Sequence, residues 1–301
     1  MNRQPSLWEY RLRAEDSGQK YLSILRHKFH FSLKLLQRLK QGERVWVDGR
    51  FTYLTARGKE GETLAIQLFS DEEASIPGED LPLEVLFEDE YLLAVNKPVG
   101  QVVHPNHRYP TNTLGNAVIG YWERKGEHRL YRPIHRIDRN TSGVVVIAKN
   151  QFAHQQLGWQ LERGHIHKRY IGFVQGVVLA SNGTIDAPLG FAPESFIKRQ
   201  TGSQGMPART HFRVLHRYPK VTLLEFVLET GRTHQIRAHC EGFGHPLLGD
   251  DLYGGEQTLI TRQALHSLVY AFLHPATGLP ILIRAPFPKD LRDLVKTLKG
   301  L

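Results

Sequence analysis

The first 70 residues carry a hydrophobic pattern that predicts a small α+β module. Leucines recur at helical spacing between residues 33 and 39, and Gly42 follows as a typical helix stop. Apolar positions then alternate on both sides of an Asp-Gly pair across residues 45–51, which is typical of a β-hairpin. A further strand is expected at 63–68. Basic residues at positions 34, 38, 40 and 44 predict a cationic face on the helix and just after it.

The remainder of the chain alternates short β-rich runs with loops and contains few helical patterns. Strands are expected at 92–95, 143–148, 170–174 and 221–228, and helices at 152–163 and 291–298. Strands in succession with a few helices, rather than a regular βαβ alternation, favour an α+β fold. We therefore predict a mixed, mainly antiparallel sheet in the large domain.

Charge divides the chain into three parts. The 301 residues carry a net charge of +9, but residues 1–69 hold +6, residues 70–90 hold −9 and residues 91–301 hold +12. The acidic stretch has no hydrophobic period at its start and contains Pro and Gly, so we predict a linker at 70–81 between domains at 1–69 and 82–301. Clustered Lys and Arg on both sides indicate a polyanionic partner such as a nucleic acid, and the plainer alternative is charge that serves solubility.

Several classes of protein lack support in the sequence. Apolar runs are too short for a membrane span and the amino terminus lacks the features of a secretory signal, so a cytoplasmic protein is expected. Cys240 is the only cysteine, which excludes an internal disulfide and favours a buried, hydrophobe-like role. Phosphate-binding loops, a helical His-Glu-x-x-His site and a serine nucleophile elbow are all missing. We expect neither a nucleotide cofactor nor a metal.

One polar segment leads directly into an apolar strand, an arrangement that holds reactive groups on a rigid support. It spans 132–148, and within it Asp138 stands between Arg136 and Arg139, whose charges favour the ionised carboxylate. The alternative interpretation is a simple turn rich in Asp, Asn and Gly.

Two further segments add candidate binding groups. Residues 229–239 place Arg232 and Arg237 among hydroxyl, amide and imidazole groups, which suit phosphate, base edges or a carboxylate. A solvated basic loop is the alternative there. Tyr170 follows two cations in a predicted strand and could stack on a base or pack in the core.

Taken together, these segments resemble the RluA family of RNA pseudouridine synthases over about residues 82–290. The family motif His-Arg-Leu-Asp-x-x-Thr-Ser-Gly is matched at 135–143, with Ile137 in place of Leu. The family's Lys-x-Tyr strand is matched at 168–170, and its Gly-Arg-Thr-His-Gln-Ile-Arg-x-His segment at 231–239, followed by Gly-x-Pro-x-x-Gly-Asp at 244–250. The first 70 residues resemble the S4 RNA-binding module, with Val-Trp-Val-Asp-Gly at 45–49.

The resemblance implies an enzyme that converts uridine in RNA to pseudouridine without metal or organic cofactor. It implies that Asp138 is the catalytic carboxylate, Arg237 its ion-pair partner and Tyr170 the aromatic that stacks on the flipped uracil, while Arg136 fills the space left by the base. Structured RNA is the expected partner, with ribosomal RNA favoured over tRNA, and a monomer is expected. The alternative is a non-catalytic RNA-binding or assembly factor that keeps the same fold.

Overall fold

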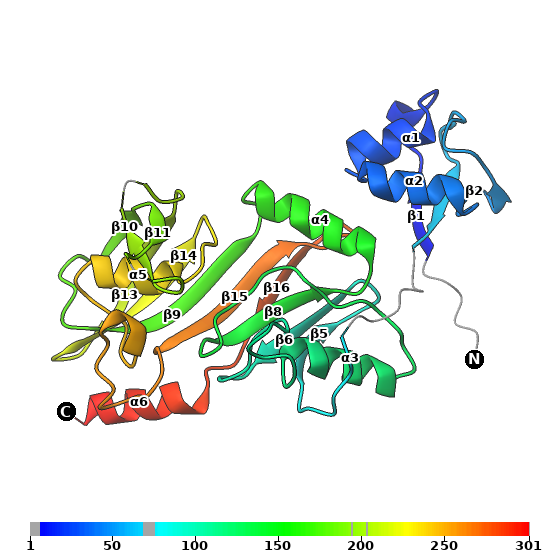
Figure 1. Ribbon diagram of the computed structural model, residues 1–301. Helices are drawn as coiled ribbons and strands as arrows, with labels where there is room; N and C mark the ends of the chain where they lie inside the picture. The colour runs from blue at the N-terminus through cyan, green and yellow to red at the C-terminus, as the bar shows by residue number, and fades with distance from the viewer. Residues whose placement is uncertain (1–6, 69–75, 194, 203, 301) are drawn as a thin grey trace.

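The N-terminal region is built around a four-stranded antiparallel sheet (Figure 1). The structure is a computed structural model, and it describes residues 7–68, 76–193, 195–202 and 204–300 of the chain. The strand order is β1-β4-β2-β3, with bounds β1 (Leu7–Arg11), β2 (Val45–Val47), β3 (Arg50–Phe51) and β4 (Thr63–Gln67). Short helical segments η1 (Ala14–Asp16), α1 (Tyr21–Ser23) and η2 (Ile24–Lys28) precede the longer helix α2 (Leu33–Gln41). The small α+β module thus has the elements that the hydrophobic pattern predicts, plus a first strand, β1, that it does not.

Local sequence explains the helix and the hairpin of this module. The Ser32 hydroxyl accepts a hydrogen bond from the backbone N–H of Leu35 at 3.2 Å and caps α2, which ends at Gly42. Asp48 and Gly49 connect β2 to β3 with φ angles of 48° and 78°, the left-handed conformation that a tight hairpin turn requires. The predicted helix, hairpin and strand are confirmed, and the S4 resemblance stays a prediction.

The module contacts the large domain through α4 (Gln151–Glu162). The Phe152 ring lies 5.8 Å from the Trp8 ring and 5.0 Å from the Phe31 ring, and all three side chains are buried in one apolar cluster. Beside them, Nη1 of Arg38 donates to Oε1 of Gln151 at 2.6 Å. A helix of the large domain therefore supplies part of the core of the small module.

The large domain contains a ten-stranded sheet. Its main path runs β10-β13-β14-β9-β15-β8-β6-β5, with β16 on β15 and β7 on β8. Neighbouring strands are antiparallel except for the parallel pair β8 and β15, so the predicted mixed, mainly antiparallel sheet is confirmed. The bounds are β5 (Glu84–Glu88), β6 (Leu92–Lys97), β7 (Arg132–Pro133), β8 (Ser142–Ala148), β9 (His167–Gln175), β10 (Asn182–Asp186), β13 (Arg209–Arg217), β14 (Val221–Leu228), β15 (Leu265–Leu273) and β16 (Pro280–Arg284), and a separate pair is formed by β11 (Leu189–Phe191) and β12 (Arg199–Thr201).

Helices cover both faces of this sheet (Figure 1). Val145 and Ile147 of β8 share an apolar cluster with α3 (Leu114–Arg124), whereas Val144 and Val146 share another cluster with α4. Because β8 is covered on both faces, its sequence is an unbroken apolar run rather than an alternating one. The helices α5 (Gln235–Gly242) and α6 (Lys289–Lys299) and the short η3 (Asp251–Tyr253) complete the large domain.

The acidic segment between the two parts is only partly described. Residues 69–75 of the chain, which include the first half of the predicted linker, lie outside the described residues. From Ile76 onward the chain lies on α3, because Ile76 is buried and the backbone N–H of Glu79 donates to the Asn116 carbonyl at 3.0 Å. The predicted domain boundaries stay a prediction.

Two smaller expectations can also be compared with the structure. Cys240 is buried in the main apolar cluster, as predicted for a hydrophobe-like cysteine. In the described ranges, none of the helices combines the length and apolar character needed to cross a membrane.

Candidate active site

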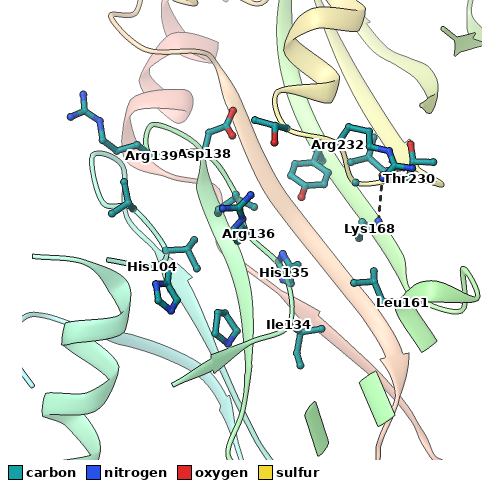
Figure 2. Close-up of a pocket in the computed structure, with 18 of the residues that line it drawn as sticks. His104, Ile134, His135, Arg136, Asp138, Arg139, Leu161, Lys168, Thr230 and Arg232 are labelled. Atoms are coloured by element: carbon teal, nitrogen blue, oxygen red, sulfur yellow. Dashed lines mark hydrogen bonds between the residues drawn. The ribbon is translucent and has the colours of Figure 1, made fainter. Parts of the chain in front are cut away.

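A cleft of about 770 Å³ opens between the loop that precedes β8 and the first residues of β9 (Figure 2). Its walls come mainly from residues 102–106, residues 133–139, the start of β9 and residues 228–233. Ligand pockets in proteins commonly have volumes of roughly 300–1,000 Å³. The cleft is therefore large enough to take a single nucleotide, and it collects the polar segments that the sequence analysis singled out.

The loop that carries Asp138 is fixed from several directions. The backbone carbonyl of Asp138 accepts a hydrogen bond from the backbone N–H of Thr141 at 3.0 Å, and this bond closes the turn. Below the turn, Nη1 of Arg262 donates to the Asn140 carbonyl at 3.2 Å, and Nε2 of Gln263 donates to Oγ1 of Thr141 at 3.3 Å. The loop thus holds its carboxylate on a rigid support, as loops between packed strands can do.

A buried lysine ties this loop to the end of β6. Lys97 is completely buried, and its Nζ donates to three backbone carbonyls, those of Pro98 and Gln101 at 2.7 Å and that of Arg139 at 3.0 Å. Burial lowers the pKa of Lys97 to about 7, while the negative charge of Asp138 acts in the opposite direction. The three carbonyls use all three hydrogens of an ammonium group, so the geometry favours the charged form.

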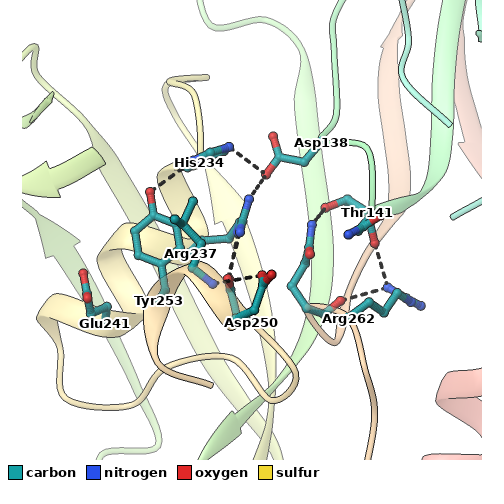
Figure 3. A network of polar contacts seen from close by, with 12 residues as sticks. Asp138, Thr141, His234, Arg237, Glu241, Asp250, Tyr253 and Arg262 are labelled. Atoms are coloured by element: carbon teal, nitrogen blue, oxygen red, sulfur yellow. Dashed lines mark hydrogen bonds and ion pairs between the residues drawn. The ribbon is translucent and has the colours of Figure 1, made fainter. Parts of the chain in front are cut away.

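Asp138 forms an ion pair with Arg237 across the cleft wall (Figure 3). Nη1 of Arg237 lies 3.1 Å from Oδ2 of Asp138, and the Asp138 side chain is 24% exposed against 8% for Arg237. The other nitrogens of Arg237 donate to Asp250, a carboxylate with no exposed surface. Burial alone would lower the pKa of Arg237, but the hydrogen bonds and charges of Asp250 and Asp138 raise it above its ordinary value. A permanent positive charge therefore lies against the half-buried carboxylate.

Tyr170 is the aromatic wall of the same site. It lies in β9 between β14 and β15, it is 7% exposed, and it lines the cleft together with Asp138. Burial raises the pKa of Tyr170 to about 12, and the charge of Asp138 acts in the same direction. The hydroxyl is therefore protonated at neutral pH, so the ring can serve as a neutral stacking surface.

The four residues that the sequence analysis named as site residues meet in space. Arg136, Asp138, Tyr170 and Arg237 all line a second, small pocket of about 60 Å³, which shares Arg136, Asp138 and Tyr170 with the cleft. Asp138 and Arg237 come from segments that are far apart in the sequence, and the sheet brings them together.

Cations line much of the larger cleft (Figure 2). Arg136, Arg139, Lys168 and Arg232 contribute to its walls, and the guanidinium of Arg139 lies over the Tyr109 ring at 5.4 Å. Three carboxylates also line it, among them Glu229, which forms ion pairs with Arg209 and His211. A cleft with this lining suits a ligand that carries phosphate groups beside a polar ring.

Sequence reasoning did not assign roles to several groups at this site. Asp250 stood in a quoted motif, yet its contact with Arg237 requires a helix and a turn that bring the two together. Tyr253 carried no signal beyond its place just after the motif at 244–250. Residues 235–242 form α5 rather than a solvated basic loop, and in this helix Arg237 and His239 are buried.

Comparisons with known proteins show the family to which the chain belongs. The family model described as "RNA pseudouridylate synthase" matches residues 91–242, which include Asp138, Tyr170 and Arg237. The chain is also 36% identical over 299 residues to the "Uncharacterized RNA pseudouridine synthase YhcT" of Bacillus subtilis (strain 168), covering 99% of each protein. The chain belongs to the RluA family of RNA pseudouridine synthases.

Further relatives of the synthase carry a more specific name. The chain is 37% identical to "Ribosomal large subunit pseudouridine synthase D" of Xanthomonas campestris pv. campestris, with 94% of this chain and 90% of the relative covered. It is 34% identical to the protein of the same name from Escherichia coli O157:H7, with 86% and 83% covered. The solved structure of "Human RNA Pseudouridylate Synthase Domain Containing 1" has a TM-score of 0.59 and 24% identity over 75% of this chain and 98% of that one, which shows a shared fold.

The family fixes the class of reaction. The synthase is an isomerase that acts on RNA, so the predicted enzyme class and the α+β pseudouridine synthase fold are confirmed. The alternative of a non-catalytic RNA-binding factor is set aside by the same comparisons.

Proposed function

We propose that this synthase modifies uridines in structured ribosomal RNA and that the Asp138 carboxylate is the group that acts on the nucleoside. The observation that carries the proposal is the ion pair of Asp138 with Arg237 at 3.1 Å, where the cleft and the small pocket meet. An ionised carboxylate held by a buried cation, and still 24% exposed toward the cleft, can reach a bound nucleoside without being free to turn away.

The reaction needs few groups. The bond between N1 of uracil and C1′ of the ribose breaks, the base turns over, and a new bond forms between C5 and C1′, while the proton on C5 is lost and N1 gains one. Asp138 acts at the nucleoside while Arg237 holds its carboxylate. Tyr170 stacks on the uracil during the turn and Arg136, an exposed cation that lines the cleft, occupies the space that the base leaves in the RNA.

Ribosomal RNA is favoured over tRNA for two reasons. Two relatives that match most of the chain are named for the large ribosomal subunit. The net charges of +6 and +12 on either side of the acidic stretch also support a large polyanion that contacts both domains.

The experiment compares Asp138→Asn with the wild type on transcripts of large-subunit ribosomal RNA and of tRNA that carry tritium at C5 of uridine. Wild type is expected to release tritium from the ribosomal transcript, and Asp138→Asn is expected to release none while its affinity for the RNA changes less than about threefold, because the amide keeps the size of the side chain but removes its charge. Asp293→Asn, on the exposed face of α6, is the matched control and is expected to keep full activity.

The proposal has two parts that fail separately. Tritium release by Asp138→Asn at the wild-type rate would overturn the role of the carboxylate. Release from tRNA alone would overturn the assignment of ribosomal RNA and leave the role of Asp138 intact.

A further inference from the structure

His234 lies beside the Asp138 carboxylate, on the same side as Arg237. Its Nε2 lies 3.9 Å from Oδ2 of Asp138, and its Nδ1 lies 3.1 Å from the hydroxyl oxygen of Tyr253 (Figure 3). We propose that His234 is a positioning residue for Asp138, and that Tyr253 fixes the imidazole with its proton on Nε2. The inference rests on the proposed role of Asp138.

The backbone of His234 indicates that its position is imposed by the site. His234 precedes α5 with φ 58° and ψ 20°, the left-handed conformation that residues with a side chain rarely adopt. At the N-cap, the position just before the first turn of a helix, a polar side chain commonly accepts from the free N–H groups, but the His234 side chain forms no such bond. Its imidazole is directed to Tyr253 and Asp138 instead, and strained residues of this kind concentrate at functional sites.

The hydrogen bonds of Tyr253 assign the tautomer of the imidazole. The backbone N–H of Arg199 donates to the Tyr253 oxygen at 2.9 Å, so the single hydrogen of the hydroxyl is available for another acceptor. Nδ1 of His234 is the acceptor in reach, at 3.1 Å. Burial raises the pKa of Tyr253 to about 12, so its hydroxyl keeps this hydrogen at neutral pH. A neutral imidazole that accepts at Nδ1 carries its hydrogen on Nε2, the nitrogen that faces Asp138.

Charges around the imidazole agree with a neutral ring. Burial lowers the pKa of His234, and the positive charges of Arg237 and Arg199 act in the same direction, whereas Asp138 and Asp250 act against them. The ring therefore contributes one N–H group to the carboxylate and no second positive charge. Arg237 supplies the positive charge beside the Asp138 carboxylate, and the N–H group of His234 orients this carboxylate.

The two contacts of the carboxylate fall on one oxygen. Arg237 donates to Oδ2 of Asp138 at 3.1 Å, and Nε2 of His234 faces the same oxygen at 3.9 Å. Among the contacts found in the described ranges none occupies Oδ1. A separation of 3.9 Å is too long for a hydrogen bond, and such contacts in free enzymes commonly shorten when substrate binds. With RNA bound, the arrangement would hold Oδ2 from two sides and leave Oδ1 to face the nucleoside.

Two variants of His234 separate its polar contacts from its backbone role. Asparagine tolerates the left-handed conformation, but its shorter side chain reaches neither Tyr253 nor Asp138, so His234→Asn is expected to lower kcat about 10- to 100-fold with KM unchanged. Glutamine can accept from Tyr253 and donate to Asp138, so His234→Gln is expected to recover most of this loss. A merely structural role would not produce this split or this rescue.

The tautomer can be tested without substrate. In the full-length protein labelled with ¹⁵N at histidine, long-range ¹H–¹⁵N spectra are expected to show His234 with its proton on Nε2. Tyr253→Phe removes the donor to Nδ1 and is expected to give a mixture of tautomers and a several-fold lower kcat. Tyr218→Phe is the control, because Tyr218 is a buried tyrosine in the cluster with α6, away from the cleft.

The outcomes distinguish this inference from the proposed function. A proton on Nδ1 of His234, or a His234→Asn enzyme with kcat within twofold of wild type, would overturn the positioning role even if Asp138→Asn is inactive. Activity of Asp138→Asn would overturn the proposed role of Asp138 itself, whatever the tautomer of His234.

Discussion

Asp250 binds Arg237 with both of its carboxylate oxygens. Nε of Arg237 donates to Oδ2 at 2.7 Å and Nη2 donates to Oδ1 at 2.8 Å, and Asp250 has no exposed surface. This bidentate pair fixes the plane of the guanidinium, so that Nη1 is the nitrogen that points to Asp138. Asp250 therefore sets the direction from which the carboxylate of the site is held.

Removal of Arg237 is expected to reduce both stability and activity. Arg237→Met leaves the buried charge of Asp250 without a partner, which should lower the free energy of unfolding by about 3–5 kcal/mol. The double variant Arg237→Met/Asp250→Leu removes both charges and should recover most of this stability in urea unfolding, yet release no tritium. A double variant as unstable as the single one would contradict the bidentate pair as the source of the loss, and recovery of activity would contradict the role of Arg237.

Gly143 is expected to tolerate no side chain. Its φ is 118°, and a Cβ placed there would lie 2.1 Å from the carbonyl oxygen of Ser267, where β8 pairs with β15. Gly143→Ala should therefore lower the free energy of unfolding by about 2 kcal/mol or more. Gly158→Ala is the control, because a Cβ at this position in α4 meets nothing within 4 Å, and it should stabilise the protein by about 0.5 kcal/mol. Equal stability of the two variants in urea would contradict the close approach of the strands.

Stability is expected to fall below about pH 6.5. His266 is completely buried, and burial lowers its pKa from 6.5 to about 4. Between these values the unfolded chain binds a proton that the folded protein does not, so acid favours unfolding, by about 1–2 kcal/mol for this residue at pH 5. His266→Gln does not titrate, so the stability difference between wild type and this variant should shrink by that amount between pH 7 and pH 5. A constant difference across this range would argue against the lowered pKa.

RNA binding is expected to weaken steeply with salt. Each phosphate that a Lys or Arg neutralises contributes about 0.7 to 0.9 to the slope of log affinity against log salt concentration. Arg232→Ala, in the cleft wall, should reduce the slope by about one such increment, whereas Lys296→Ala on α6 should leave it unchanged. Filter binding across a salt series measures both, and a flat response of the wild type would remove the electrostatic interpretation of the cleft.

Local patterns predicted much of the fold because they depend on near neighbours. The helix that ends at Gly42, the Asp48-Gly49 hairpin and the buried strand β8 follow from spacing and turn chemistry alone. The place of β15 in the middle of the sheet does not follow from local patterns, because strand order depends on contacts between distant segments.

The residues of the candidate site were likewise predicted only in part from the sequence. The motifs named Asp138, Tyr170, Arg136 and Arg237, and the structure brings these four side chains to one pocket. Partners such as Asp250 could not be predicted, because a buried carboxylate and a surface one look alike in sequence. The residues before α5 were equally hard to interpret, since His234 precedes this helix in a left-handed conformation that no helix signal describes.

The central place of β15 has a consequence for the newly made chain. This strand is the next to last in sequence, yet it lies between β8 and β9 and pairs with Ser142 and Gly143 on one side. Until it emerges from the ribosome, β9 keeps an open edge and the segments that carry Asp138 and Arg237 belong to separate sheets. At synthesis rates of about 5–20 residues per second, the segments that carry Asp138 and Arg237 stay apart for several seconds before the strand that joins them emerges. Assembly of the cleft is thus delayed until β15, which ends at Leu273, has been translated.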